Sequence, residues 1–153
     1  MCRLSPIFSI GYGVSGSIPE DYFSKDFYSN IISGNLKVDK IERGHVTCHL
    51  TVHPVIANYY DGLHGGAVAA IAERVAIACA KTVIAEDKEI FLGELSISYL
   101  SAAPKNEELI VDGSIVRSGK NVTVVATELK FKKTGKLAFT SRATFYNIPV
   151  AKL

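Results

Sequence analysis

The chain has 153 residues, 48% of them hydrophobic and 21% charged, a composition typical of one globular domain with an apolar core. Its net charge is only +2 and its lysines and arginines are scattered, so we expect no nucleic-acid partner. No segment has the roughly 20 apolar residues of a membrane span, and 3 cysteines without a Cys-x-x-Cys spacing favour a reducing compartment.

The first expected element is a short amphipathic helix from Pro19 to about Ser33. Ser17 and Glu20 have the spacing of a capping box, and proline suits a first helical turn. Apolar side chains then follow at four-residue steps, at Phe23, Phe27 and Ile31. We assign residues 1–34 to an N-terminal extension and residues 35–153 to the main domain.

A hairpin and a long helix are expected next. Segments 35–41 and 45–52 lie on either side of a short polar turn, and apolar and polar residues alternate in the second of them, as in a half-buried hairpin. From Gly65 to about Ile84, alanine dominates and no turn residue occurs. This predicts a helix that is apolar on nearly every side and therefore buried.

Four later segments, rich in β-branched and aromatic residues and joined by short polar turns, predict an antiparallel meander. They are residues 91–101, 108–117, 121–132 and 136–147. The order of hairpin, long helix and strands indicates an α+β domain, with a curved antiparallel sheet wrapped around a central helix.

Two local patterns receive simple interpretations. Gly11 to Gly16 match Gly-x-Gly-x-x-Gly, but a dinucleotide site needs a parallel βαβ unit, and antiparallel strands follow here. His45, His49 and His53 recur every four residues, but on a strand such neighbours lie about 13 Å apart, too far to share one metal ion. We therefore expect no metal site.

Cationic turns are candidates for binding phosphate groups, although a solvated hairpin is the default interpretation. One turn contains Arg117, Ser118, Gly119 and Lys120, and the other contains Lys136. Lysine binds phosphate as a point charge, so either turn can serve a phosphorylated ligand.

Glu73 stands in the middle of the apolar helix. An unpaired carboxylate buried there costs several kcal/mol, and such positions are common where a carboxylate takes part in catalysis. The alternative is a structural ion pair with Arg74 or Arg142. Adjacent helical residues diverge by about 100°, which places Arg74 poorly for such a pair.

The segment LHGGAVAAIAE, residues 63–73, resembles the hotdog-fold acyl-CoA thioesterases, in the subfamily of the phenylacetate-pathway thioesterase and thioesterase-superfamily member 2. The likeness runs from about Leu36 to Tyr146 and includes the segments SISYLSAAPKNEEL, SGK and TGK. It implies hydrolysis of an acyl- or aroyl-CoA thioester to the free acid and CoA, without a metal or redox cofactor.

The resemblance also implies roles for five residues. A backbone N–H of Gly65 or Gly66, at a helix N-terminus with its positive dipole end, polarises the thioester carbonyl. Asn58 positions the attacking water or the thioester, and His64 shapes the same pocket. Glu73 acts as the general base or as the nucleophile.

His64 and Glu73 are nine residues apart, or about 13 Å along a helix and on opposite sides of it. The resemblance implies two protomers with antiparallel helices, in which Glu73 of one faces the helix N-terminus of the other, and a dimer of such dimers. Leu92, two residues before Glu94, departs from relatives that have a serine or threonine there. Either that hydroxyl is dispensable, or the alignment is shifted, or the acyl pocket is more apolar.

Two rival functions share the expected fold: an acyl-thioester hydratase or dehydratase with histidine as a direct base, and a non-catalytic acyl-CoA-binding protein. The final tripeptide, residues 151–153, reads Ala-Lys-Leu, one conservative step from a peroxisomal import signal. We expect a peroxisomal or else a cytoplasmic protein.

Overall fold

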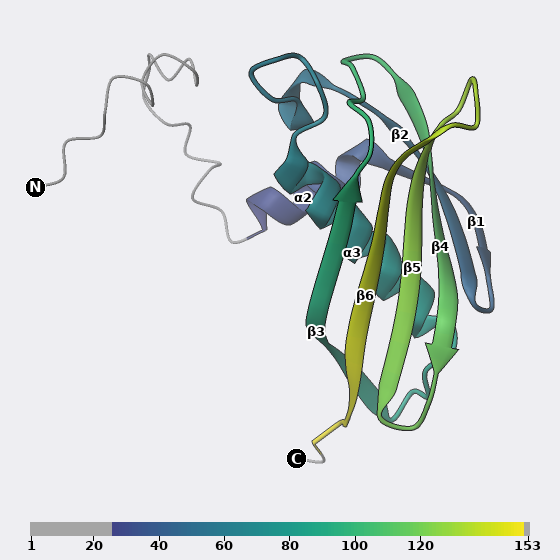
Figure 1. Ribbon diagram of the computed structural model, residues 1–153. Helices are drawn as coiled ribbons and strands as arrows, with labels where there is room; N and C mark the ends of the chain where they lie inside the picture. The colour runs from purple at the N-terminus through teal and green to yellow at the C-terminus, as the bar shows by residue number, and fades with distance from the viewer. Residues whose placement is uncertain (1–25, 152–153) are drawn as a thin grey trace, which may run out of the picture.

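The structure, a computed structural model, describes residues 26–151 (Figure 1). In chain order its elements are α2 (Phe27–Asn35), β1 (Leu36–Glu42), β2 (His45–Thr51), the 3-10 turn η2 (Pro54–Ile56), α3 (Gly65–Lys81), β3 (Lys88–Tyr99), β4 (Glu108–Ser118), β5 (Val122–Phe131) and β6 (Leu137–Pro149).

Helix α2 corresponds to the second half of the expected N-terminal helix. Its earlier half, the capping box and the glycine pattern of residues 11–16 lie outside the described residues. The helix ends at Asn35, two residues later than expected, because Gly34 is tolerated and the Asn35 side chain donates a hydrogen bond to the Ile31 carbonyl (2.7 Å). The chain then enters β1 directly.

The six strands form one antiparallel sheet in the order β1-β2-β4-β5-β6-β3, and this sheet wraps around α3 (Figure 1). The expected meander is correct for β4, β5 and β6 but wrong for β3, which lies at the far edge beside β6. The reason is that α3 carries the chain across the sheet, and the 100–107 loop then returns it to a place beside β2. Alternation of residues along a strand does not encode its neighbours.

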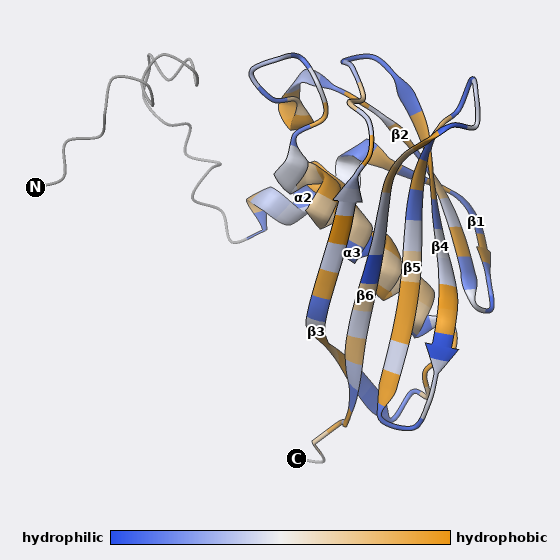
Figure 2. Ribbon diagram, viewed as in Figure 1, coloured by the Kyte–Doolittle hydropathy of each residue, from blue (hydrophilic) through white to orange (hydrophobic). Residues whose placement is uncertain are grey.

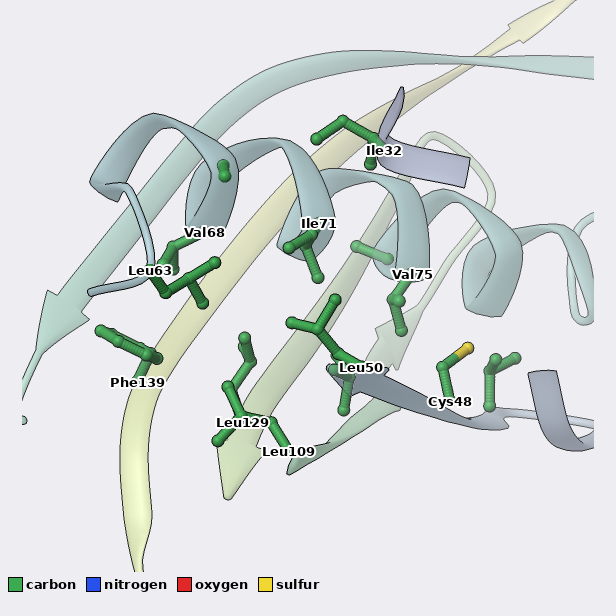
Figure 3. Packing of buried hydrophobic residues seen from close by; sticks show 14 of the residues in the cluster. Ile32, Cys48, Leu50, Leu63, Val68, Ile71, Val75, Leu109, Leu129 and Phe139 are labelled. Carbon is green, nitrogen blue, oxygen red and sulfur yellow. The ribbon is translucent and has the colours of Figure 1, made fainter. Parts of the chain in front are cut away.

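The core lies between α3 and the inner face of the sheet. Figure 3 shows Val68, Ile71 and Val75 of the helix pointing toward Leu50, Leu109 and Leu129 of the strands, and all six are buried. Figure 2 shows the matching pattern, with apolar colouring along α3 and alternation along the strands.

The expectation that α3 is buried on every side is wrong for the single chain. Only the sheet-facing side is fully buried, whereas the outer side contains residues that are half-buried or exposed, among them Ala70, Glu73 and Arg74. Helix α2 packs on that outer side through Ile32, which is only 3% exposed and lies across α3 from the sheet residues (Figure 3). Alanine is compatible with either environment, so composition alone did not separate them.

Helix α3 ends at Lys81, three residues before the expected end. The Thr82 hydroxyl donates to the Cys79 carbonyl (2.6 Å) and accepts from the Gly44 N–H (2.8 Å). This side chain therefore ends the helix and ties it to the β1–β2 turn, where Gly44 has a φ of 82°.

Candidate active site

His64 is the N-cap of α3 and sets the geometry of the helix N-terminus. Its backbone is extended, and its Nδ1 atom accepts a hydrogen bond from the Gly66 N–H (2.9 Å). A neutral imidazole that accepts at Nδ1 carries its proton on Nε2. In this arrangement the Nε2–H group of His64 can donate a hydrogen bond, whereas the basic lone pair on Nδ1 is already engaged.

The cap distinguishes the two glycines of the expected oxyanion site. The Gly66 N–H is occupied by His64, whereas the Gly65 N–H has no hydrogen-bond partner within residues 26–151. The first turn of a helix has several such unpaired donors, and the helix dipole places its positive end there. Gly65 is therefore the glycine that can donate to an incoming oxygen.

Asn58 sits in a tight loop whose backbone fixes its side chain. Its Oδ1 accepts from the N–H groups of Tyr60 (2.9 Å) and Gly62 (3.0 Å), and its own N–H donates to the Gly62 carbonyl (2.7 Å). Its Nδ2 group makes no hydrogen bond to any described residue. The loop thus orients the amide so that the NH₂ group is left as a free donor.

A pocket of about 460 Å³ brings Asn58 and Gly65 together. Its other walls come from the 62–63 loop, the end of β3 with the segment after it, and Phe139. Two N–H donors that line one pocket and have no partner among the described residues are groups that can stabilise negative charge on a carbonyl oxygen.

Tyr99, at the end of β3, belongs to the same pocket and was not expected from the sequence. Its hydroxyl donates to the Gly65 carbonyl (3.0 Å), and its ring packs edge-to-face on Phe139 with the ring centres 5.9 Å apart. The strand pattern ending in Tyr99 is visible in the sequence. Its contact with Gly65 depends on the placement of β3 at the sheet edge, which the sequence pattern did not predict.

Glu73 lies in a different pocket, of about 200 Å³, on the outer side of α3. It is half-buried and forms no ion pair with Arg74 or any other described residue. Arg142 is exposed on the outer face of the sheet, since it pairs there with Ser96, so the sheet separates it from α3. The structure therefore provides no ion pair that would explain Glu73.

One chain does not bring Glu73 to the Asn58 pocket. Eight residues separate Gly65 from Glu73, about 12 Å along the helix. Arg74 also lines an apolar groove beside Val46 and Cys48 of β2, and Glu73 is about 100° away around the helix. Glu73 therefore lies on the outer side of α3, beside α2, and not in the Asn58 pocket.

The cationic turns lie at opposite ends of the sheet (Figure 1). The turn with Arg117, Ser118, Gly119 and Lys120 joins β4 to β5, and Lys136 lies between β5 and β6, so the 10 residues of β5 separate them by about 33 Å. Lys136 is at the same end as the Asn58 pocket. One chain cannot place Lys120 and Lys136 on the same phosphate group.

Leu92 faces the α3 side of the sheet, opposite Phe145. A bulge at Gly93, over which the Tyr146 ring packs, turns Glu94 to the outer face. Leu92 and Glu94 thus point to opposite sides although they are two residues apart. Leu92 stands where the resemblance implies a hydroxyl in some relatives, and its side chain is apolar and on the helix side.

The three histidines that recur every four residues lie along β2 and just after it. His45 and His49 pair on the outer face with Asp112 (3.4 Å) and Asp39 (3.7 Å), while His53 follows the end of β2. No cluster of histidine, cysteine, aspartate or glutamate in residues 26–151 is arranged to hold a metal ion. Within the same range, no helix combines the length and apolar character needed to cross a bilayer.

The chain is similar in sequence and in fold to known thioesterases. A family model described as the thioesterase superfamily matches residues 60–138. Human acyl-coenzyme A thioesterase 13 is 23% identical over 113 residues, which are 74% of this chain and 80% of the human protein. Zebrafish thioesterase superfamily member 2 has a similar structure, with a TM-score of 0.74 and 21% identity over 82% of this chain and 89% of that chain. A Streptococcus mutans protein solved with bound acetyl-CoA has a TM-score of 0.70 and 21% identity, over 77% of this chain and 92% of that chain.

Proposed function

Because this chain belongs to the thioesterase superfamily and has its hotdog fold, we propose that it hydrolyses acyl-CoA thioesters to the free acid and CoA. The observation that carries the proposal is the pair of unpaired donors, Asn58 Nδ2 and the Gly65 N–H, on one pocket at the N-terminus of α3. The name of the human relative and the acetyl-CoA bound to the Streptococcus mutans protein support CoA thioesters as the substrate class.

The thioester carbonyl oxygen would lie between these two donors. Negative charge develops on that oxygen when the carbonyl carbon is attacked, and both donors are held in place beforehand by the Asn58 loop and by the helix. Removing one such donor typically lowers kcat by about 10²- to 10³-fold. Tyr99 would hold the Gly65 peptide in position through its carbonyl.

Glu73 would promote attack on the thioester carbonyl carbon by one of two routes. As a base, it removes a proton from water while the oxygen adds to the carbonyl carbon, the C–S bond breaks, and the CoA thiolate takes up that proton. As a nucleophile, its carboxylate adds to the carbonyl carbon and expels the thiolate, leaving an anhydride that water hydrolyses. Both routes require an unpaired carboxylate, as Glu73 is among the described residues.

The site requires a second protomer, because Glu73 and the donors occupy separate pockets in one chain. Within the described residues, strand β3 is a 12-residue edge strand with one unpaired side, and Glu73 lies on the outer side of α3. Antiparallel pairing of two β3 edges would set Glu73 of one protomer against the Asn58 pocket of the other. A dimer of such dimers, as the resemblance implies, is part of this proposal.

Mixing two inactive variants tests the shared site. Asn58→Ala and Glu73→Ala homodimers should each be nearly inactive in a thiol-release assay, because each change spoils every site. After dissociation and random re-pairing, half of the dimers are heterodimers with one intact site of two, so activity should return to about a quarter of wild type. Each variant carried alone through the same procedure is the control, and verified heterodimers without activity would refute the shared site.

The rival functions make different predictions. In a hydratase, histidine is the base, but here the acceptor nitrogen of His64 already binds the Gly66 N–H. A non-catalytic acyl-CoA-binding protein would bind the thioester without releasing CoA thiol. Peroxisomal targeting by the terminal Ala-Lys-Leu stays a prediction, since residues 152 and 153 lie outside the described range.

A further inference from the structure

Helix α2 supplies one wall of the pocket that contains Glu73. Tyr28, Ser29 and Ile32 come from α2, and the opposite wall consists of α3 residues around Glu73. The pocket lies on the side of α3 that faces away from the sheet, where Figure 3 shows Ile32. Helix α2 precedes residues 60–138, the part that the family model matches.

The chemistry of the pocket suits an acyl chain. Ile32, Ala70 and Ile77 are apolar, and the charged side chains that line it are Glu73 and Arg74. In the proposed reaction the acyl chain is bonded to the carbon that is attacked beside Glu73. It must therefore leave that point along an apolar surface, and the α2–α3 pocket begins there.

The volume of the pocket gives a length scale for the acyl chain that would fill it. Its volume is about 200 Å³. At about 30 Å³ for a group the size of a water molecule, this volume holds six or seven carbon-sized groups. Tyr28, one turn before Ile32, presents the bulkiest side chain of the α2 wall and is 59% exposed, so its removal would enlarge the pocket on its solvent side.

We propose that Tyr28 influences acyl-chain length, because its ring forms part of the wall of the Glu73 pocket, whose volume matches about six or seven carbons. This inference rests on the proposed function, because it assumes that thioester cleavage takes place at Glu73. It assigns a role in substrate choice to the N-terminal helix.

The test is a chain-length profile of kcat/KM for the full-length protein, with saturated acyl-CoAs from 4 to about 16 carbons, an upper limit well beyond the pocket volume. Tyr28→Ala should move the optimum upward by about two to four carbons, because the lost ring frees room for several carbon-sized groups. Tyr28→Phe retains the ring and should keep the wild-type optimum. Tyr146→Ala is the matched control, since it removes a ring of similar exposure (50%) from the outer face of the sheet.

The outcomes separate the two proposals. If wild type releases no thiol from any acyl-CoA, the proposed function fails. If wild type is active and Tyr28→Ala, shown to be folded by circular dichroism, keeps the wild-type optimum, the role of Tyr28 is refuted. An equal shift in Tyr146→Ala would refute it as well, because the effect would not depend on the pocket.

Discussion

Replacing Glu73 by glutamine should separate catalysis from stability. The side chain forms no ion pair or hydrogen bond with another described residue, so its charge can be removed without breaking a contact. Glutamine has nearly the same size and helix propensity, which places the change in the free energy of unfolding within about 0.5 kcal/mol. A positioned base contributes about 10²- to 10⁴-fold in rate, or about 2.7 to 5.4 kcal/mol of transition-state stabilisation.

The assay pairs thiol release from the best acyl-CoA with urea unfolding of the same samples. We expect kcat to fall by at least 100-fold, while the urea midpoint stays unchanged or rises slightly. Glu86→Gln, which alters an exposed carboxylate in the turn after α3, controls for charge and should retain wild-type turnover. A folded Glu73→Gln protein with full turnover would refute the catalytic role, and a large loss of stability would show that Glu73 is structural.

Three further predictions each concern a single residue. Tyr99→Phe removes the hydrogen bond to the Gly65 carbonyl, worth about 0.5 to 1.5 kcal/mol, so kcat/KM should fall by about 2- to 12-fold, and an unchanged value would exclude a positioning role. Lys136→Ala should raise KM more than it lowers kcat and should weaken the salt dependence of KM, whereas an unaltered KM at low salt would leave the turn as a solvated hairpin. Burial raises the pKa of the Cys79 thiol from 9.0 to about 11, so the folded state holds this proton more tightly than the unfolded state does, and stability should decline between about pH 9 and pH 11. Cys79→Ala should make that decline shallower in urea unfolding under reducing conditions, and an equally steep decline would assign it to other groups.

Local patterns predicted most elements of the fold but not how the strands are arranged. Alternation located the strands within a few residues, and the glycines after His64 located the start of α3 at Gly65. The edge position of β3 could not be predicted, because it depends on where the chain crosses the sheet. For the same reason, the contact between Tyr99 and Gly65 joins residues 34 positions apart that no local pattern relates.

The candidate site was predictable in its residue types and less so in its details. Glu73 was expected inside a fully apolar helix, but its surroundings depend on α2, a separate element that covers part of the outer side. Leu92 and Glu94 are two residues apart, which on a regular strand would place them on one face, but the bulge at Gly93 separates them. Which glycine N–H is free was decided by the rotamer of His64, a side-chain choice that spacing does not encode.

The His64 cap has a consequence for how this site can change by mutation. A main-chain N–H is retained in nearly every substitution, so a site built on Gly65 cannot readily lose its donor through a side-chain replacement. The side chain at position 64 controls instead how many main-chain donors compete for the substrate. In His64→Ala, the neighbouring Gly66 N–H would be released and a carbonyl oxygen could bind one residue too far along the helix. The residue before the helix therefore determines which main-chain N–H binds the carbonyl oxygen, although its side chain need not contact the reacting bond.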